Sequence, residues 1–227
     1  MALKKNDFIE IEFTGMVKNG EIFDSNIKED LKKANLDIEP KPFVFCLGEG
    51  MFLNGIEEFL LGKEIGKYEI ELSPERAFGS RNPKLIQIIP SKSFKEQKLN
   101  PLPGVMFNFD GRLAKVISVS QGRILVDFNN PMAGKTVVYK VNVMRKIDDM
   151  NEKAKSLIEF LFKSDLKFEI KDNNITVYSD EKFVKFIELF KDKFKSILGL
   201  DLRAKAKENK EKQKEEKKKA MPNGTSR

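Results

Sequence analysis

The stretch FIEIEFTGMVKNGEIFDS, residues 8–25, does most to predict the fold. After Phe8 its first residues alternate apolar and acidic side chains, which is the period-two pattern of an antiparallel strand with one buried face. Asn19-Gly20 follows, and this dipeptide favours the positive φ angles of a tight hairpin turn. The chain is therefore predicted to fold back along Ile22-Phe23 and to start an antiparallel sheet.

Further segments up to residue 147 fit the same sheet. Phe43 to Leu47 is apolar and Tyr68 to Leu72 alternates, so both are predicted strands. Residues 52–61 carry apolar side chains three and four apart, which is the spacing of a short amphipathic helix. Thr136 to Val143 is strongly β-branched and predicts a last strand, whose natural partner is the first sheet.

Residues 83–130, called the insert below, differ from the preceding segments in composition and in sequence pattern. Four of the nine prolines lie here, and short strand patterns are separated by turns at Asp110-Gly111 and Gly122-Arg123, which indicates a small β-rich unit. A unit this small buries its apolar surface poorly, so part of that surface is expected to stay exposed for binding. Alternation alone leaves open which apolar residues face outward; the candidates are Ile86, Ile88, Ile89, Phe94, Leu102, Val105, Met106 and Phe107.

The C-terminal part is predicted to form a separate α-β-β-α domain over residues 148–202. Helical spacing, an alternating hairpin and a long apolar stripe ending at Gly199 follow one another. Two amphipathic helices on one hairpin motivate the hypothesis of a homodimer through this domain; a second client-binding surface and a stabilising appendage are alternatives. Residues 203–227 repeat Lys and Glu, so a disordered tail or a solvated helix is expected.

Composition excludes several classes of enzyme. The sequence has no histidine, which rules out Ser-His-Asp and Cys-His catalysis, the common zinc sites and a histidine pH switch. Its single cysteine, Cys46, cannot form an internal disulfide and is expected to be a core thiol. Carboxylate-only metal sites and paired acids remain allowed by residue type. The sequence contains no EF-hand and no Gly-rich phosphate loop, and no metal and no cofactor are expected.

The formal charge of +7 is almost entirely a property of the tail. Residues 203–227 have a net charge of +6, which leaves +1 for the first 202 residues. The tail is therefore expected either to be simply solvated or to make a weak, salt-sensitive contact with a ribosome, a nucleic acid or a membrane surface. No run reaches the ~20 apolar residues of a membrane span, and the start lacks a secretory pattern, so a cytoplasmic protein is expected.

Five motifs, in matching order and spacing, resemble the FKBP-type peptidyl-prolyl cis-trans isomerases. They are Phe13-Thr14-Gly15-Met16, Gly20 to Ser25, Pro42 to Phe45, Leu47-Gly48 with Gly55-Ile56-Glu57-Glu58, and Ala77-Phe78-Gly79. The insert resembles the insert-in-flap domain of SlyD-like and archaeal long-type members. Residues 129–135 are similar to the run that closes that insert, with Asn130 in place of the family's histidine.

The resemblance implies an α+β fold in which an antiparallel half-barrel sheet wraps a short helix. Residues 1–82 and 131–147 would form the isomerase domain and 83–130 the inserted domain. It also implies a non-covalent isomerase with a proline pocket in which Ile56 forms the floor, where the family often has tryptophan, and the Leu53 N–H holds a substrate carbonyl. The implied catalytic residues are Asp24, Phe23, Phe78 and Tyr139, and the implied substrate-binding residues are Phe13, Phe43, Phe52, Leu53 and Ile56.

The same resemblance implies that the insert binds unfolded or nascent polypeptides and passes their X-Pro bonds to the pocket. Rotation about such a bond crosses a barrier of roughly 18–20 kcal/mol without breaking any bond, so no histidine is required. Two other functions remain in competition: a non-catalytic holdase chaperone, and an adaptor that binds a ribosome or nucleic acid through the basic tail.

Overall fold

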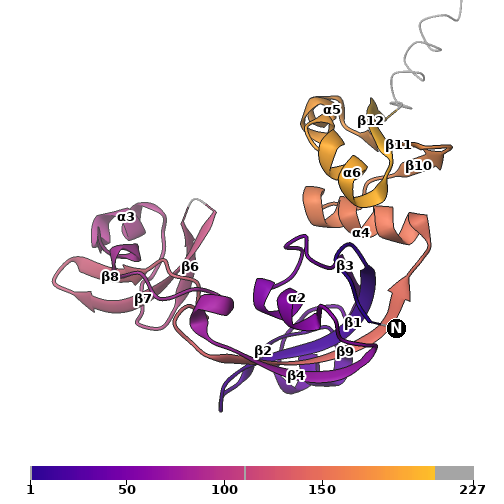
Figure 1. Cartoon of the computed structure of the whole chain (residues 1–227). Helices are drawn as coiled ribbons and strands as arrows, with labels where there is room; N and C mark the ends of the chain where they lie inside the picture. The colour runs from indigo at the N-terminus through magenta and orange to yellow at the C-terminus, as the bar shows by residue number, and fades with distance from the viewer. Residues whose placement is uncertain (1, 110, 208–227) are drawn as a thin grey trace, which may run out of the picture. The chain divides into compact units, whose positions relative to one another are not determined.

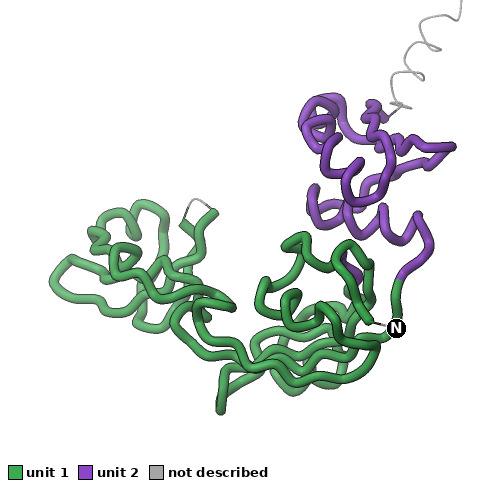
Figure 2. Tube along the Cα trace, viewed as in Figure 1, with its two compact units in different colours: residues 1–43, 47–146 green, residues 44–46, 147–227 purple. Residues whose placement is uncertain are grey.

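The computed structural model describes residues 2–109 and 111–207, which fall into two compact units (Figures 1 and 2). Unit 1 contains residues 1–43 and 47–146, and unit 2 contains residues 44–46 and those from 147 onward. The short piece 44–46 groups with unit 2, where the Ser156 hydroxyl donates to the Val44 carbonyl at 2.6 Å. Among the described helices none is both long and apolar enough to cross a membrane.

The first sheet of the chain is mainly antiparallel and contains the strands that the sequence predicts. Its order is β2-β1-β9-β4, with β3 paired to β1; the strands are β1 (Phe8–Val17), β2 (Ile22–Ser25), β3 (Phe43–Cys46), β4 (Gly66–Leu72) and β9 (Val137–Ile147). Asn19 has a φ of 59° in the β1–β2 turn, as the hairpin prediction requires. Cys46 is fully buried, which confirms its expected place in the core.

Two helices accompany this sheet. α2 (Asn54–Leu60) is the predicted amphipathic helix and buries Ile56 and Leu60 completely, so the arrangement is compatible with a sheet wrapped on a short helix. α1 (Lys28–Lys33) was not predicted, because six residues with Leu31 as the only buried side chain carry no readable period. It is held by the Thr14 hydroxyl, which donates to Asp30 Oδ2 at 2.7 Å.

The insert forms its own four-stranded sheet with one helix. After two short 3₁₀ helices, η1 (Pro74–Arg76) and η2 (Pro83–Leu85), the sheet has the order β5-β8-β7-β6. Its elements are β5 (Ile86–Pro90), α3 (Ser91–Glu96), β6 (Met106–Phe109), β7 (Arg112–Ser120) and β8 (Arg123–Asp127), so the predicted strands are present and α3 is additional.

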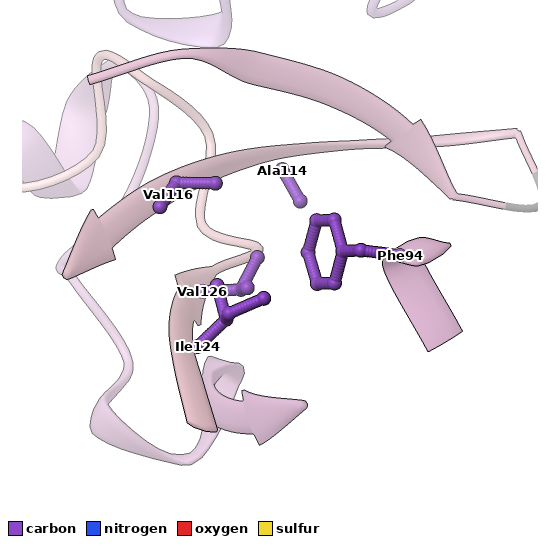
Figure 3. Packing of buried hydrophobic residues seen from close by; sticks show 5 residues of the cluster. All are labelled: Phe94, Ala114, Val116, Ile124 and Val126. Carbon is purple, nitrogen blue, oxygen red and sulfur yellow. The ribbon is translucent and has the colours of Figure 1, made fainter. Parts of the chain in front are cut away.

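The core of the insert corrects part of the predicted binding surface. Phe94 of α3 is fully buried against Ala114, Val116, Ile124 and Val126 (Figure 3). Ile89 and Phe107 also pack against this core, so these three aromatic and aliphatic side chains are not an exposed surface. The sequence left open which of the candidates face outward; Phe94 does not, because helix α3, which the sequence did not reveal, decides which sheet face is covered.

Unit 2 is more complex than the predicted α-β-β-α domain. Its elements are α4 (Met150–Phe162), β10 (Phe168–Lys171), β11 (Asn174–Ser179), α5 (Glu181–Glu188), α6 (Lys191–Leu198) and β12 (Asp201–Ala206), with the sheet order β10-β11-β12. The predicted last helix is two helices, and Gly199 (φ 73°) ends the second.

β12 also corrects the boundary of the tail. It pairs in parallel with β11, so residues 203–206 belong to the sheet and not to a disordered extension. Leu202 is buried, but the alternation around it is short and merges with the charged run that follows, which hid the strand in the sequence. The rest of the predicted tail, residues 208–227, lies outside the described residues.

Candidate active site

The aromatic side chains expected at a proline pocket come together at one end of the first sheet. This aromatic cluster comprises Phe13 of β1, Phe23 of β2, Phe43 of β3, Tyr139 of β9, and Phe52 and Phe78 from loops. Ring centroids are 5.0 Å apart for Phe13 and Phe52, 5.8 Å for Phe23 and Tyr139, and 5.6 Å for Phe23 and Phe78. Strands that are distant in sequence therefore build one apolar site.

Tyr139 lies at the centre of the cluster because β1 offers no side chain opposite its ring. A Cβ atom at Gly15 would lie only 2.8 Å from the Cε1 and Cζ atoms of Tyr139. The glycine therefore allows the ring to lie directly against the backbone of β1. Tyr139 is 1% exposed, and its ring also meets those of Phe13 and Phe52.

Two ionisable groups border the cluster. Burial raises the pKa of the Asp24 carboxyl, although the Ser25 backbone N–H opposes the shift by donating to it. Burial, with a smaller contribution from the Asp24 charge, raises the pKa of the Tyr139 phenol far above its usual range. The phenol is thus neutral at physiological pH and available as a hydrogen-bond donor in a poorly hydrated site.

The loop before α2 is organised by Glu57, whose side chain is 3% exposed. Its carboxylate accepts hydrogen bonds from the backbone N–H groups of Gly48 (2.7 Å), Gly50 (3.2 Å) and Phe52 (2.7 Å). One buried carboxylate therefore sets the path of residues 48–52. Sequence reasoning noted Glu57 only as part of a motif, and its place inside the predicted helix over residues 52–61 gave no signal for this role.

The other two predicted binding residues adjoin this loop. Leu53 is half-buried at the start of α2, and its N–H has no hydrogen-bond partner among the described residues, so it is free to meet a ligand carbonyl. Ile56 is fully buried on the inner face of α2. Both positions agree with the roles expected of them, which stay predictions.

A polar network fixes β1 against the segment that follows β2. The Phe13 N–H donates to Asn26 Oδ1 at 2.7 Å, and Asn26 Nδ2 donates to the Ile11 carbonyl at 2.9 Å. The Ser25 hydroxyl donates to the Phe13 carbonyl at 3.0 Å. These bonds hold Phe13 and Asp24 in register, and the residues that make them were not identified from the sequence.

A second network joins the two chain segments that connect the insert to the first sheet. Asp127 is buried and accepts hydrogen bonds from the Arg81 guanidinium and, at 2.6 Å, from Asn129 Nδ2. Asn129 in turn accepts from the Asn82 N–H at 2.8 Å. Asn130, which replaces the family's histidine, accepts from the Met132 N–H at 2.8 Å and thereby supports the turn that follows.

No metal-binding group of three Asp, Glu, Cys or His side chains is formed within residues 2–109 and 111–207. The groups of the candidate site are its aromatic rings, Asp24, the Tyr139 hydroxyl and the Leu53 N–H. Such an arrangement can bind a small apolar ring and present few polar groups to it.

Comparison with known proteins identifies the family. The family model described as FKBP26, IF domain matches residues 87–132. A short-type peptidyl-prolyl cis-trans isomerase of Methanocaldococcus jannaschii is 30% identical over 145 residues, which cover 62% of this chain and 92% of that protein. The chain belongs to the FKBP-type peptidyl-prolyl cis-trans isomerases.

Other members of this family are also similar to the chain. An FKBP-type 16 kDa isomerase of Escherichia coli is 36% identical over 109 residues, covering 46% of this chain and 73% of that protein. SlyD of Aeromonas hydrophila is 27% identical over 138 residues, or 60% of each chain. The protein is therefore an enzyme that catalyses peptidyl-prolyl cis-trans isomerisation, as the sequence analysis predicted.

Proposed function

We propose that the aromatic cluster is the site at which this isomerase rotates X-Pro bonds during protein folding. The observation that carries the proposal is the convergence of five phenylalanine rings, from three strands and two loops, around the neutral phenol of Tyr139. A proline ring is small and apolar, so the apolar surface of these mutually packed aromatic rings suits it.

The physical requirement of the reaction matches such a site. In the planar ground state the amide is conjugated and strongly hydrated, whereas the twisted transition state has lost that conjugation. Poorly hydrated aromatic walls favour the twisted form relative to the planar one, which is the differential binding that lowers a barrier. A reduction of ~5 kcal/mol corresponds to an acceleration on the order of 10³- to 10⁴-fold.

Each polar group then has a distinct role in this proposal. The Leu53 N–H holds a backbone carbonyl of the substrate, and the Tyr139 hydroxyl donates to the carbonyl that rotates out of plane. Asp24 acts on the twisted amide electrostatically, from a half-buried position beside the Tyr139 ring. Phe23 and Phe78, whose rings meet edge to face, form together one apolar wall against which the proline packs.

The test is catalysis of a proline-limited refolding reaction and of X-Pro isomerisation in a short peptide. Phe78→Ala in the full chain should lower kcat/KM in both assays by at least tenfold, because one wall of the cluster is lost. Phe168→Ala removes a half-buried ring of β10 in unit 2 and serves as the matched control. Full activity of Phe78→Ala would place the reaction elsewhere.

We further propose that the insert binds unfolded chains through the face of its sheet opposite Phe94. In antiparallel pairs, residues directly across from each other share a face. The pairs Ile88 with Leu125 and Met106 with Lys115 therefore lie on the face opposite the core pairs such as Val116 with Val126. Residues of this outer face are strongly exposed: Ile88 (62%), Leu113 (52%), Met106 (40%) and Ile117 (38%).

This outer face revises the set of candidate binding residues. Ile88 and Met106 belong to it with Ile86, which is half-buried, whereas Leu102 (54% exposed) and Val105 (37%) lie in the segment before β6. Leu113, Ile117 and Leu125 were not among the predicted residues. An exposed apolar face across all four strands is the kind of surface that binds unfolded polypeptides.

A double variant, Ile88→Ser with Leu113→Ser, tests the outer face. It should reduce suppression of aggregation and catalysis of protein refolding severalfold while peptide isomerisation is retained. Ile65→Ser changes an isoleucine of similar exposure (51%) outside the insert and is the control. An equal loss of activity in the peptide assay would show damage to the catalytic domain. It would contradict the proposal that the insert binds unfolded chains while the aromatic cluster catalyses isomerisation.

The remaining hypotheses have less support. A holdase without catalysis does not explain an intact aromatic cluster with Asp24 and Phe78 in place. The proposed homodimer through residues 148–202 is supported by exposed apolar side chains at α5, among them Phe183 (57%) and the C-cap residue Leu189 (77%). A monomer in sedimentation at high micromolar concentration would contradict it. Most of the tail that would contact a ribosome or nucleic acid lies outside the described residues.

A further inference from the structure

A groove of about 330 Å³ adjoins the aromatic cluster at Phe52. One wall is the start of α2, with residues 52–55 and Glu58, and the other is the loop around η1, with Glu75, Arg76 and Ala77. The walls approach closely at Gly55, where a Cβ atom would lie 2.7 Å from the Arg76 carbonyl oxygen. The groove is thus built by the same two segments that carry Phe52 and Phe78 into the cluster.

The groove walls have an uncompensated negative charge. Arg76 Nη2 lies 2.8 Å from Glu58 Oε2, so the charge of Arg76 is already matched by one carboxylate. Hydrogen bonds from its own backbone N–H, Ser73 and Ser80 lower the pKa of the second carboxyl, Glu75. Glu75 is therefore ionised at neutral pH, and the three charged groups sum to −1.

Apolar atoms lie between these charges. Phe52, Leu53 and Ala77 line the groove and are each half-buried. Lysine and arginine side chains bury their methylene stems on apolar surface while the charged head stays near water and carboxylates. A groove that combines this apolar lining with an excess of one carboxylate therefore suits the stem and the charge of these two side chains.

The groove is continuous with the reaction site. The Phe52 ring lies 5.0 Å from Phe13 and 5.7 Å from Tyr139, measured between centroids, and the same residue lines the groove. An extended chain advances ~3.3 Å per residue, so a peptide with its proline in the cluster crosses the groove within one or two residues. We propose that the groove is a subsite for a lysine or arginine side chain near the isomerised proline, and that Glu75 and Glu58 make the enzyme prefer such segments.

This inference rests on the proposed location of the reaction at the aromatic cluster, so the experiment separates the two. Isomerisation is measured by NMR exchange for amidated peptides that differ only beside the proline, with Lys, Gln or Glu on either side. The uncharged Gln peptide measures isomerase activity independently of any charge preference. At low salt the Lys peptide should exceed the Glu peptide in kcat/KM by about two- to fivefold, the effect of one exposed ion pair. In 1 M salt, where the Debye length is about 3 Å, the preference should disappear.

Variants of the full chain assign the preference to the groove. Glu75→Gln should bring the Lys-to-Glu ratio of kcat/KM close to one, and Glu75→Lys should invert it. Glu71→Gln removes an exposed, ion-paired carboxylate of β4 that does not line the groove, and should leave the ratio unchanged. Equal rates for the Lys and Glu peptides on both sides of the proline would overturn the subsite, as would a ratio unaffected by Glu75→Lys. If Phe78→Ala abolishes turnover of all the peptides, the aromatic cluster is supported as the reaction site, even where the other results overturn the subsite.

Discussion

Glu57→Gln tests how the loop before α2 holds the binding residues in place. The carboxylate accepts three backbone N–H groups, at 2.7 Å from Gly48 and Phe52 and at 3.2 Å from Gly50. Glutamine has the same shape but replaces one acceptor oxygen by an NH₂ group. At least one of these N–H groups must then face a donor, whichever way the amide is oriented.

The size of the effect follows from these contacts. A hydrogen bond to a charged group contributes about 1.5–3 kcal/mol, and an N–H left without an acceptor adds a further penalty. We expect the free energy of opening the loop to fall by about 2–4 kcal/mol, which corresponds to amide hydrogen exchange about 30- to 700-fold faster at residues 48, 50 and 52. Because Phe52 and the Leu53 N–H move with the loop, kcat/KM should fall about 10- to 100-fold.

The measurements are hydrogen exchange by NMR and X-Pro isomerisation of a short peptide, both on the full chain. Glu69→Gln, which removes an exposed carboxylate of β4, controls for the change in net charge. The reasoning is refuted if Glu57→Gln leaves exchange at Phe52 unchanged and kcat/KM within twofold of the parent protein.

Three further predictions concern the cluster and the junction of the insert. Gly15→Ala forces the Tyr139 ring away from β1 and should cost about 1–3 kcal/mol, seen as a lower thermal midpoint, with loss of isomerase activity; unchanged activity would contradict the packing described. Burial raises the pKa of Asp24, so its contribution to stability is fully present below the unfolded value of about 3.9 and is lost as pH rises through the folded-state pKa. Asp24→Asn should therefore gain stability relative to the parent chain between pH 3 and 7, and a constant difference in urea titrations would speak against this. Asp127→Ala deprives Arg81 of its acceptor and should lower stability by about 1–3 kcal/mol in thermal unfolding; an unchanged midpoint would mean that the junction network contributes little.

Elements with several periods of alternation were predictable, whereas short ones were not. The strands of the first sheet and of the insert were identified because side-chain alternation is a local property of each strand. α1, α3 and β12 are each six residues long and place few apolar side chains inward, so their identity depends on the partners that cover them. The break between α5 and α6 does not interrupt the helical spacing of the apolar side chains, so the sequence pattern does not reveal it either.

The candidate site divides in the same way. The aromatic residues were identified through the resemblance that five motifs establish, and in the structure each ring lies within 5.0–6.1 Å of at least one other ring of the cluster. The role of Gly15 depends on Tyr139, which is distant in sequence. The role of Glu57 depends on backbone N–H groups, which every residue except proline carries, so no residue type reveals it. The junction residues Arg81 and Asp127, 46 positions apart, meet only when the insert has folded back.

The sequence by itself determined the class of chemistry. With no histidine, it excluded histidine-dependent catalysis and the common zinc sites, and the resemblance of five motifs to the FKBP-type isomerases pointed to a reaction that needs no histidine. Tertiary structure alone decided which apolar residues of the insert face outward. Phe94 covers one face of the four-stranded sheet and leaves Ile88 and Leu113 exposed on the other, because a sheet has two faces and only packing selects the one that becomes the core.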